Sequence, residues 1–185
     1  APQYAGALED QMGMAQEILT ALGYAGVHFQ LVRADSSSEL GNALAAAPGG
    51  VAPLQAATFH LAQEKRNALD MALDHLYRHA TLKPAHVPLP PTAPFGAILV
   101  DKARCTLCMS CVGSCPSSAL MDSDGVPQLR FIEKNCVQCG LCANTCPENA
   151  ITLAPRMSFA ETWNKAVVLN QTEPFCCIRC NKPFG

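Results

Sequence analysis

The positions of the cysteines constrain this chain more than any other feature of its sequence. All eleven cysteines of the 185-residue chain lie between Cys105 and Cys180, and the first hundred residues contain none. Eight of them form two runs, CTLCMSCVGSCP at 105–116 and CVQCGLCANTCP at 136–147, both spaced C-x2-C-x2-C-x3-C-P and offset by 31 residues. Three thiolates at every third position can surround three corners of an iron–sulfur cubane. The spacing therefore indicates two cluster-binding loops, each of which needs a fourth thiolate from elsewhere.

Two other uses of eight cysteines fit this pattern less well. Disulfide scaffolds do not usually show a regular C-x-x-C-x-x-C spacing twice, each time ending in Cys-Pro. Zinc could occupy some of the C-x-x-C pairs, but two triplets with two remote cysteines suit cubanes better than tetrahedral zinc sites. Both runs are complete, so a 3Fe-4S centre with a missing ligand is not indicated.

With these two runs, the segment resembles the two-cluster bacterial-type ferredoxins over about 60 of the 185 residues. In that family the distant fourth cysteine of each run ligates the other cluster. The resemblance implies one 4Fe-4S cluster held by Cys105, Cys108, Cys111 and Cys146 and a second held by Cys136, Cys139, Cys142 and Cys115. It also implies a pseudo-twofold arrangement of strands and short helices. We expect an α+β ferredoxin-like domain at 97–156.

Local patterns place secondary structure around the two loops. Strand-like sequence precedes each run, at 97–100 and 128–132, and a last strand is expected at 151–153. Pro116 and Pro147 suit the first turn of short helices at 116–120 and 147–150. Small residues inside the loops let backbone N–H groups approach the cysteine sulfurs, and such hydrogen bonds stabilise a reduced cluster.

The segment 1–80 is predicted to be mostly helical, as part of an α/β unit. Apolar residues recur at helical spacing from about 7 to 22, and Gly23 stands where such a helix would end. Alternation at 27–32 predicts a short strand, and Ser36 with Glu39 resembles a capping box that opens a second helix. A longer helix is expected at about 54–79. This segment is also faintly similar to the delta-type iron–sulfur subunits of hydrogenase and heterodisulfide reductase systems, although it has none of their cluster cysteines.

Two further segments complete the expected organisation. Residues 81–96 contain five prolines and are predicted to form a semi-rigid linker. Residues 157–185 form a tail in which a packing helix is expected at 159–169. The tail ends with Cys177-x-x-Cys180, which looks like half of a zinc-binding site and would need two further ligands from Cys176, a histidine or residues beyond this sequence. A third cluster is a less favoured use of these cysteines. With a lone strand at one end and half a metal site at the other, we expect a piece of a longer iron–sulfur protein.

Charge and motif content narrow the function. The net charge is −2 and neither half has a basic excess, which argues against nucleic-acid binding. No stretch approaches the length of a membrane span, and no signal-peptide pattern follows Ala1, so a cytoplasmic location is expected. No nucleophile, general-base pair or nucleotide-binding glycine loop is evident.

The chain is thus expected to carry electrons rather than to catalyse a reaction by itself. We expect it to relay single low-potential electrons through two clusters to a redox protein such as a flavoprotein, hydrogenase, formate dehydrogenase or heterodisulfide reductase. One alternative is the relay arm of an oxidoreductase whose catalytic part lies outside this chain. Another is a structural iron–sulfur or zinc interaction module.

Overall fold

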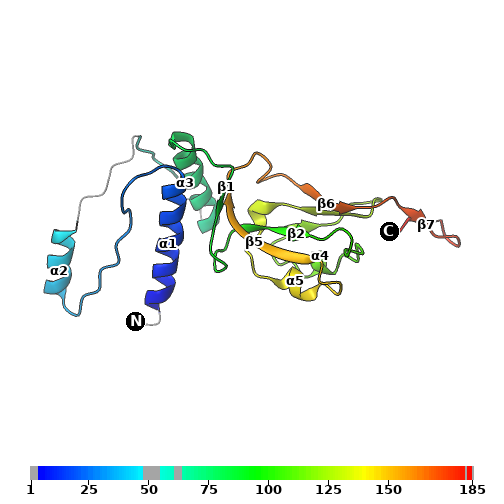
Figure 1. Ribbon diagram of the computed structural model, residues 1–185, viewed down its shortest axis with the longest axis horizontal. Helices are drawn as coiled ribbons and strands as arrows, with labels where there is room; N and C mark the ends of the chain where they lie inside the picture. The colour runs from blue at the N-terminus through cyan, green and yellow to red at the C-terminus, as the bar shows by residue number, and fades with distance from the viewer. Residues whose placement is uncertain (1–3, 48–54, 61–63, 182, 185) are drawn as a thin grey trace. The chain divides into compact units, whose positions relative to one another are not determined.

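The computed structural model describes residues 4–47, 55–60, 64–181 and 183–184. It divides the chain into two compact units, Ala1–Pro84 and Ala85–Gly185, and each is described here by itself. The combination of helices with small antiparallel sheets makes the protein mixed α+β, as expected (Figure 1). Among the described residues, no helix has the length and apolar character needed to cross a bilayer.

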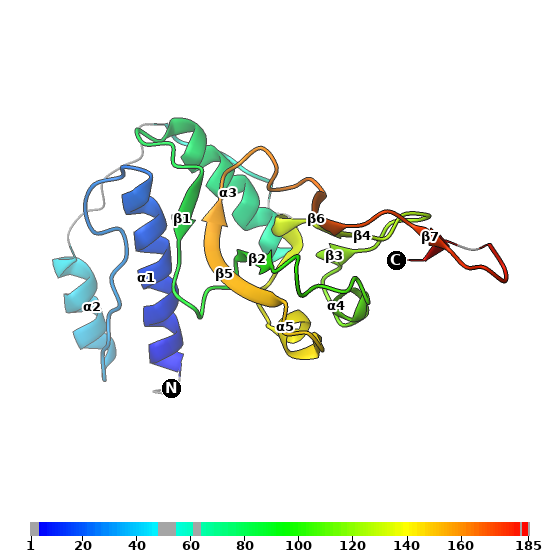
Figure 2. The same ribbon diagram turned by 45° about the vertical axis from the view of Figure 1, so that its right-hand side comes forward.

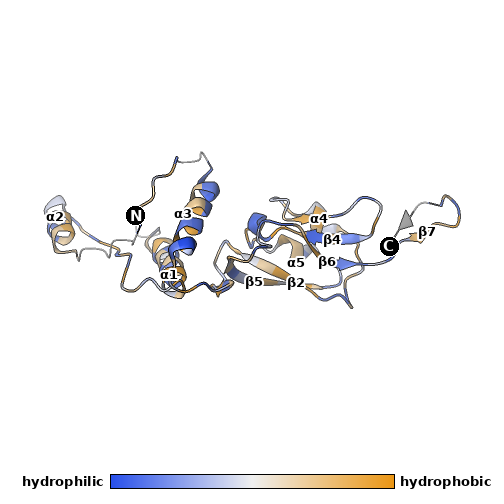
Figure 3. Cartoon of the chain, turned by 90° about the horizontal axis from the view of Figure 1, so that it is seen from above, coloured by the Kyte–Doolittle hydropathy of each residue, from blue (hydrophilic) through white to orange (hydrophobic). Residues whose placement is uncertain are grey.

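The first unit is held together where two of its helices end. Helix α1 spans Ala5–Ala21, close to the predicted 7–22, and helix α3 spans Lys65–His79. Leu22 is fully buried directly after α1, and its carbonyl accepts a hydrogen bond from Leu82 N at 3.1 Å. The Tyr24 hydroxyl donates to the Leu76 carbonyl at 2.8 Å. Helix α3 carries both hydrophilic and hydrophobic residues, as expected for a helix that is buried on one side (Figure 3).

Glycine is required at position 23, where the chain leaves α1. Gly23 has a φ of +85°, and a Cβ there would lie 2.0 Å from Thr81 Oγ1. The predicted helix stop is confirmed, and its reason is both conformational and steric.

The predicted cap at Ser36 is confirmed, but Glu39 accepts from Asp35 N rather than from the Ser36 N–H of a standard capping box. Helix α2 spans Ser37–Ala46, and the Ser36 side chain accepts a hydrogen bond from Glu39 N at 3.1 Å. The Glu39 carboxylate accepts one from Asp35 N at 3.0 Å, so each side chain of the pair satisfies a backbone N–H. None of the described side chains of α2 is buried.

Two predictions for this unit are wrong. Residues 27–32 form no strand, and His28 N instead donates to Gln16 Oε1 at 2.8 Å. A strand needs a hydrogen-bonded neighbour, and every strand in the described part of the chain lies at His86 or later. The predicted helix at 54–79 begins only at Lys65. Residues 55–60 are all exposed, so no buried face supports a helix there; positions 54 and 61–63 lie outside the described residues.

The second unit contains a three-stranded antiparallel sheet with the order β1-β5-β2 (Figure 2). Its strands are β1 (His86–Pro88), β2 (Gly96–Val100) and β5 (Ile151–Ser158), and β2 pairs with β5 from Gly96↔Pro155 to Val100↔Ile151. The segment expected as a linker therefore contains a strand, and Leu89 and Ala93 beyond it are buried. Its prolines are tolerated because β1 is an edge strand, which pairs only with β5.

A second antiparallel sheet has the order β3-β4-β6. Strand β3 spans Leu120–Met121, β4 spans Gln128–Phe131 and β6 spans Val167–Gln171. The helix predicted at 159–169 is wrong, because its β-branched end, Val167 and Val168, pairs with β4. Trp163 lies in a turn before β6, with Lys134 Nζ 5.4 Å from its ring centroid.

The short helices of the second unit lie on the other side of the remote cysteines from the positions predicted. Helix α4 spans Ser110–Gly113 and helix α5 spans Leu141–Thr145, whereas 116–117 and 147–148 form turns and Leu120 already belongs to β3. Ser118 and Asn149 have φ values of +52° and +47°, which stop a helix from continuing after Pro116 and Pro147. The core between the loops and sheets contains Ala97, Ile98, Cys111, Ala119, Leu120, Leu129, Phe131, Cys136 and Ile151.

Candidate iron–sulfur sites

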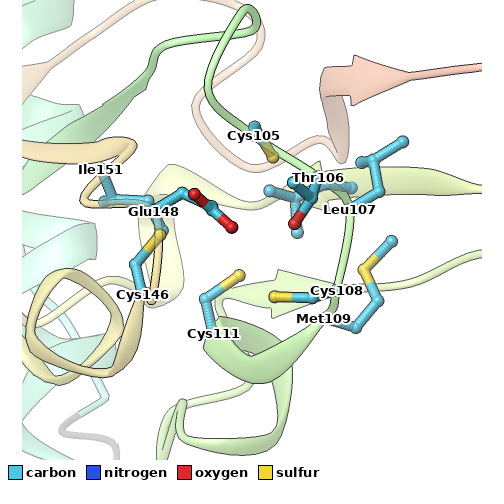
Figure 4. A pocket seen from close by; sticks show the side chains of 10 residues that line it. Cys105, Thr106, Leu107, Cys108, Met109, Cys111, Cys146, Glu148 and Ile151 are labelled. Atoms are coloured by element: carbon cyan, nitrogen blue, oxygen red, sulfur yellow. The ribbon is translucent and has the colours of Figure 1, made fainter.

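Four cysteines from both runs line one cavity in the second unit. They are Cys105, Cys108, Cys111 and Cys146, accompanied by Leu129, Glu148 and Ile151 among others. Figure 4 shows the four sulfurs arranged around a common space. The loop that carries the first three begins with a turn after β2, in which Asp101 accepts hydrogen bonds from Ala103 N at 3.0 Å and Cys105 N at 2.9 Å.

The other four cysteines of the runs line a second cavity. They are Cys115, Cys136, Cys139 and Cys142, and the wall between them includes Ile98, Phe131 and Gln138. Every one of the eight cysteines from the two runs is thus brought to one of two cavities, in the same groups of four that the resemblance implies.

The two loops repeat one backbone conformation at the 31-residue offset. Positive φ values occur at Leu107 (+55°) and Gln138 (+53°), and again at Met109 (+58°) and Gly140 (+78°). Residues in this left-handed region reverse the chain tightly, which lets cysteines three positions apart face the same cavity. Met109 is an unusual residue to hold there, and its counterpart Gly140 adopts the conformation without steric cost.

Each short helix connects the two cavities. Cys111 lies within α4 and lines the first cavity, whereas Cys115, four residues later, lines the second. Cys142 in α5 and Cys146 after it make the same connection in the opposite direction. Because only three residues separate the two cysteines in each case, the two sites are close neighbours.

Burial separates the cysteines of each loop. Cys111 and Cys136 are buried, whereas Cys108 and Cys139 are exposed. Burial raises the pKa of the Cys111 thiol to about 11, and it also raises the pKa of Cys136 and of Cys142. The side-chain and backbone hydrogen bonds of Ser110 lower the pKa of Cys108. The second cysteine of each run, Cys108 or Cys139, is therefore the one that is exposed to solvent.

Hydrogen bonds to the sulfurs come from both backbone and side chains. Ala150 N donates to Cys146 Sγ at 3.3 Å, and Gln138 Nε2 donates to Cys136 Sγ at the same distance. For Cys115, burial is the largest single effect and raises the pKa, but hydrogen bonds from Leu120 N, the Ser117 hydroxyl and Ala119 N outweigh it and lower the pKa overall. Donors of this kind stabilise negative charge on thiolate ligands.

Gln138 is held in place by the strand opposite. Its Nε2 also donates to the Ala97 carbonyl at 2.9 Å, and Gly96 provides the room: a Cβ at Gly96 would lie 2.7 Å from Gln138 Cδ and 2.5 Å from the Ala154 carbonyl oxygen. The sequence reading missed Gln138 and Glu148 as cavity residues. A position-by-position comparison of the two runs could have identified them, because the equivalent residues differ in chemistry. Gln138 corresponds to the apolar Leu107, and Glu148 corresponds to the uncharged Ser117.

The three remaining cysteines lie in a hairpin at the end of the chain. Strand β7 spans Phe175–Cys176 and pairs with β8, which spans Pro183–Phe184. Between them Asn181 N donates to the Cys177 carbonyl at 2.8 Å, and the backbone N–H groups of Cys180 and Arg179 lower the pKa of the Cys177 thiol. In the described part of the chain, no group of three or more His, Cys, Asp or Glu side chains is arranged to hold a single metal ion.

Comparison with known proteins agrees with this geometry. Residues 104–151 match the family model of the 4Fe-4S dicluster domain, a range that includes all eight cavity cysteines. The search of curated proteins gives no match for the chain.

These residues therefore form an iron–sulfur domain of the ferredoxin type. The chemistry of the donors fits that class: thiolates are the ligands that 4Fe-4S clusters use, and each cavity presents four of them. The match extends over the cluster loops and leaves the first unit and the hairpin unassigned.

Proposed function

We propose that the protein holds two 4Fe-4S clusters and relays single low-potential electrons between redox partners. Cys105, Cys108, Cys111 and Cys146 bind one cluster, and Cys115, Cys136, Cys139 and Cys142 bind the other. A bound cluster accepts and releases one electron at a time, and the protein supplies position, burial and hydrogen bonds. The observation that carries the proposal is the sorting of eight cysteines from two runs into two four-thiol cavities.

The spacing of the sites supports transfer from one to the other. Cys111 in α4 is four residues from Cys115, and Cys142 in α5 is four residues from Cys146, so only a short stretch of chain separates a ligand of one site from a ligand of the other. The exposed Cys108 and Cys139 give each site one edge near solvent, where a partner can approach. Electrons thus enter the protein at the exposed edge of one site and leave it at the exposed edge of the other.

The partner in this proposal is a redox protein with its own active site, of the flavoprotein, hydrogenase, formate dehydrogenase or heterodisulfide reductase type. A second candidate is that the chain serves as the relay arm of a larger oxidoreductase. The separate unit Ala1–Pro84 favours it, because two clusters need only the second unit for their ligands. Co-purification with a flavin- or molybdenum-containing protein separates the second candidate from a free carrier.

We also propose that Cys177 and Cys180 contribute two ligands to a zinc site. The hairpin supports this, because backbone N–H groups aimed at Cys177 stabilise the thiolate form that zinc binds.

The test is to measure iron, sulfide and zinc per chain after anaerobic purification, with EPR spectra after dithionite reduction. About eight irons and a signal from two interacting S = 1/2 clusters are expected. Zinc without iron would overturn the electron-transfer proposal and leave a structural module. Loss of zinc in Cys177→Ala, with iron unchanged, is expected for the hairpin site.

A further inference from the structure

The two cavities differ at positions that the 31-residue repeat makes equivalent. Gln138 in the second loop corresponds to Leu107 in the first, and both share the same left-handed backbone conformation. Gln138 donates from Nε2 to Cys136 Sγ at 3.3 Å, whereas the hydrocarbon side chain of Leu107 has no donor. At this loop position the second site therefore has a side-chain hydrogen bond to a buried ligand sulfur, and the first site has none.

The orientation of the Gln138 amide is fixed by chemistry. Nε2 faces the Ala97 carbonyl at 2.9 Å, and a carbonyl oxygen only accepts hydrogen bonds. If the amide were turned over, Oε1 would face both that carbonyl and the Cys136 sulfur, so the NH2 group is the end that faces Cys136. Oε1 is buried and has no hydrogen-bond partner among the described residues.

A second difference acts in the same direction. Glu148 lines the first cavity, and its carboxylate points into the space between the sulfurs of Cys105, Cys111 and Cys146 (Figure 4). The equivalent residue in the second cavity is Ser117, whose hydroxyl lies 3.7 Å from Cys115 Sγ. A carboxylate destabilises added negative charge nearby, whereas a hydroxyl can donate a hydrogen bond to it. Glu148 is exposed, so solvent screens part of its charge.

Two differences act in the opposite direction and are weaker, and both concern Cys108. Ser110 Oγ lies 3.4 Å from Cys108 Sγ, and the Thr106 side chain also hydrogen-bonds this thiol; the equivalent residues in the second loop are Leu141 and Val137. Cys108 is exposed, so water can donate to its sulfur with or without Ser110, whereas Cys136 is buried and depends on protein donors. A hydrogen bond has more effect on charge in the buried, low-dielectric position.

We propose that Gln138 and Glu148 make the two sites unequal, so that the cluster held by Cys115, Cys136, Cys139 and Cys142 has the higher reduction potential and holds the first electron. A reduced cluster carries one more negative charge than an oxidised one, and the Gln138 donor stabilises it at the second site. The Glu148 carboxylate disfavours it at the first. This inference rests on the proposed pair of clusters, and it gives the relay a direction: the second site is the acceptor end.

The test is an EPR-monitored redox titration of the full chain, purified anaerobically, in the wild type and in two variants that each copy the other loop. Gln138→Leu should lower only the higher midpoint, and Glu148→Ser should raise only the lower one. Each variant therefore reduces the difference between the two midpoint potentials, one by lowering the higher potential and the other by raising the lower potential. For Gln138→Leu we expect the reduced-to-oxidised ratio of the second site to fall about tenfold at fixed potential, equivalent to about 59 mV for a one-electron couple.

Controls separate this proposal from the one it rests on. Gln128→Leu removes a glutamine whose side chain bonds Gln171 on the neighbouring strand, and it should leave both midpoints unchanged. Equal midpoints in the wild type, or variants that move both midpoints together, would overturn the inference while the iron content still supported two clusters. An iron content well below eight per chain would instead overturn the proposed function itself.

Discussion

Cys146 lines the same cavity as Cys105, although the two belong to different cysteine runs. The chain brings them together because β2, which precedes the first run, pairs in antiparallel register with β5, which follows the second. Val100 and Ile151 are partners in that register, so the start of one loop and the end of the other meet at one end of the sheet. The sheet thus determines which remote cysteine serves which loop.

The first prediction concerns this crossed arrangement. Cys146→Ala should damage the same site as Cys111→Ala, and Cys115→Ala should damage the same site as Cys142→Ala. Each variant should fall from about eight irons per chain to about four, and EPR spectra of the remaining cluster should match within each pair and differ between pairs. Cys177→Ala, outside both cavities, is the control and should keep the wild-type iron content. If Cys146→Ala instead gave the spectrum of Cys142→Ala, each run would be serving its own site.

A second prediction concerns the reactivity of Cys177. Backbone N–H groups of Cys180 and Arg179 lower its pKa from the ordinary 9.0, so more of it is thiolate near neutral pH. In zinc-free protein, alkylation of Cys177 by iodoacetamide should therefore reach half its maximal rate at a lower pH when the chain is folded than when it is denatured, as followed by mass spectrometry across a pH series. In denatured protein the midpoint should move up toward the ordinary value. Identical profiles in the folded and denatured chain would contradict the hydrogen bonds assigned to this thiol.

A third prediction concerns the ion pair between Arg156 on β5 and Glu133, in the turn Glu133–Asn135 that leads into the second run. Two hydrogen bonds of 2.8 Å join them, and only 11% of the Glu133 side chain is exposed. Arg156→Leu leaves that carboxylate without its partner and should cost about 1–3 kcal/mol. The measurement is the temperature at which cluster absorbance is lost at a fixed heating rate, because unfolding with cluster loss is irreversible.

The control for Arg156→Leu is Arg78→Leu. Arg78 pairs with Asp74 one helical turn away, but both side chains are more than half exposed. Exposed pairs of this kind contribute little to stability, so this variant should show no measurable change. Equal effects of the two substitutions would show that burial of Glu133 does not matter.

A fourth prediction concerns the start of α2. Ser36→Ala removes the acceptor for Glu39 N and should destabilise this helix by about 0.5–2 kcal/mol. Because no described side chain of α2 is buried, the effect should stay local. Amide hydrogen exchange should become faster within 37–46 and remain unchanged in α1 and α3. Ser38→Ala, inside the helix, is the control; faster exchange in both variants would mean that the cap is not what holds the helix.

The sequence by itself determined the features that depend on neighbours along the chain. The helix cap at Ser36, the helix stop at Gly23 and the strands that precede each run all follow from local conformational preference. The spacing of the cysteines indicates two cluster loops, whereas the two fourfold sets were implied by the resemblance to two-cluster ferredoxins.

What only the tertiary structure decided depends on partners that are distant in sequence. Residues 27–32 have strand-like alternation but no neighbouring strand, whereas 167–169, expected as the end of a helix, belong to β6, which pairs with β4. The proline-rich segment after Pro84 supplies an edge strand because β5 offers an unpaired side. Gln138 has a role only because Gly96, on β2, leaves room for its amide between the Ala97 carbonyl and the Cys136 sulfur. Hydrogen bonds between separate segments, and the burial of one segment against another, form only in the folded chain. The local sequence pattern therefore does not predict them.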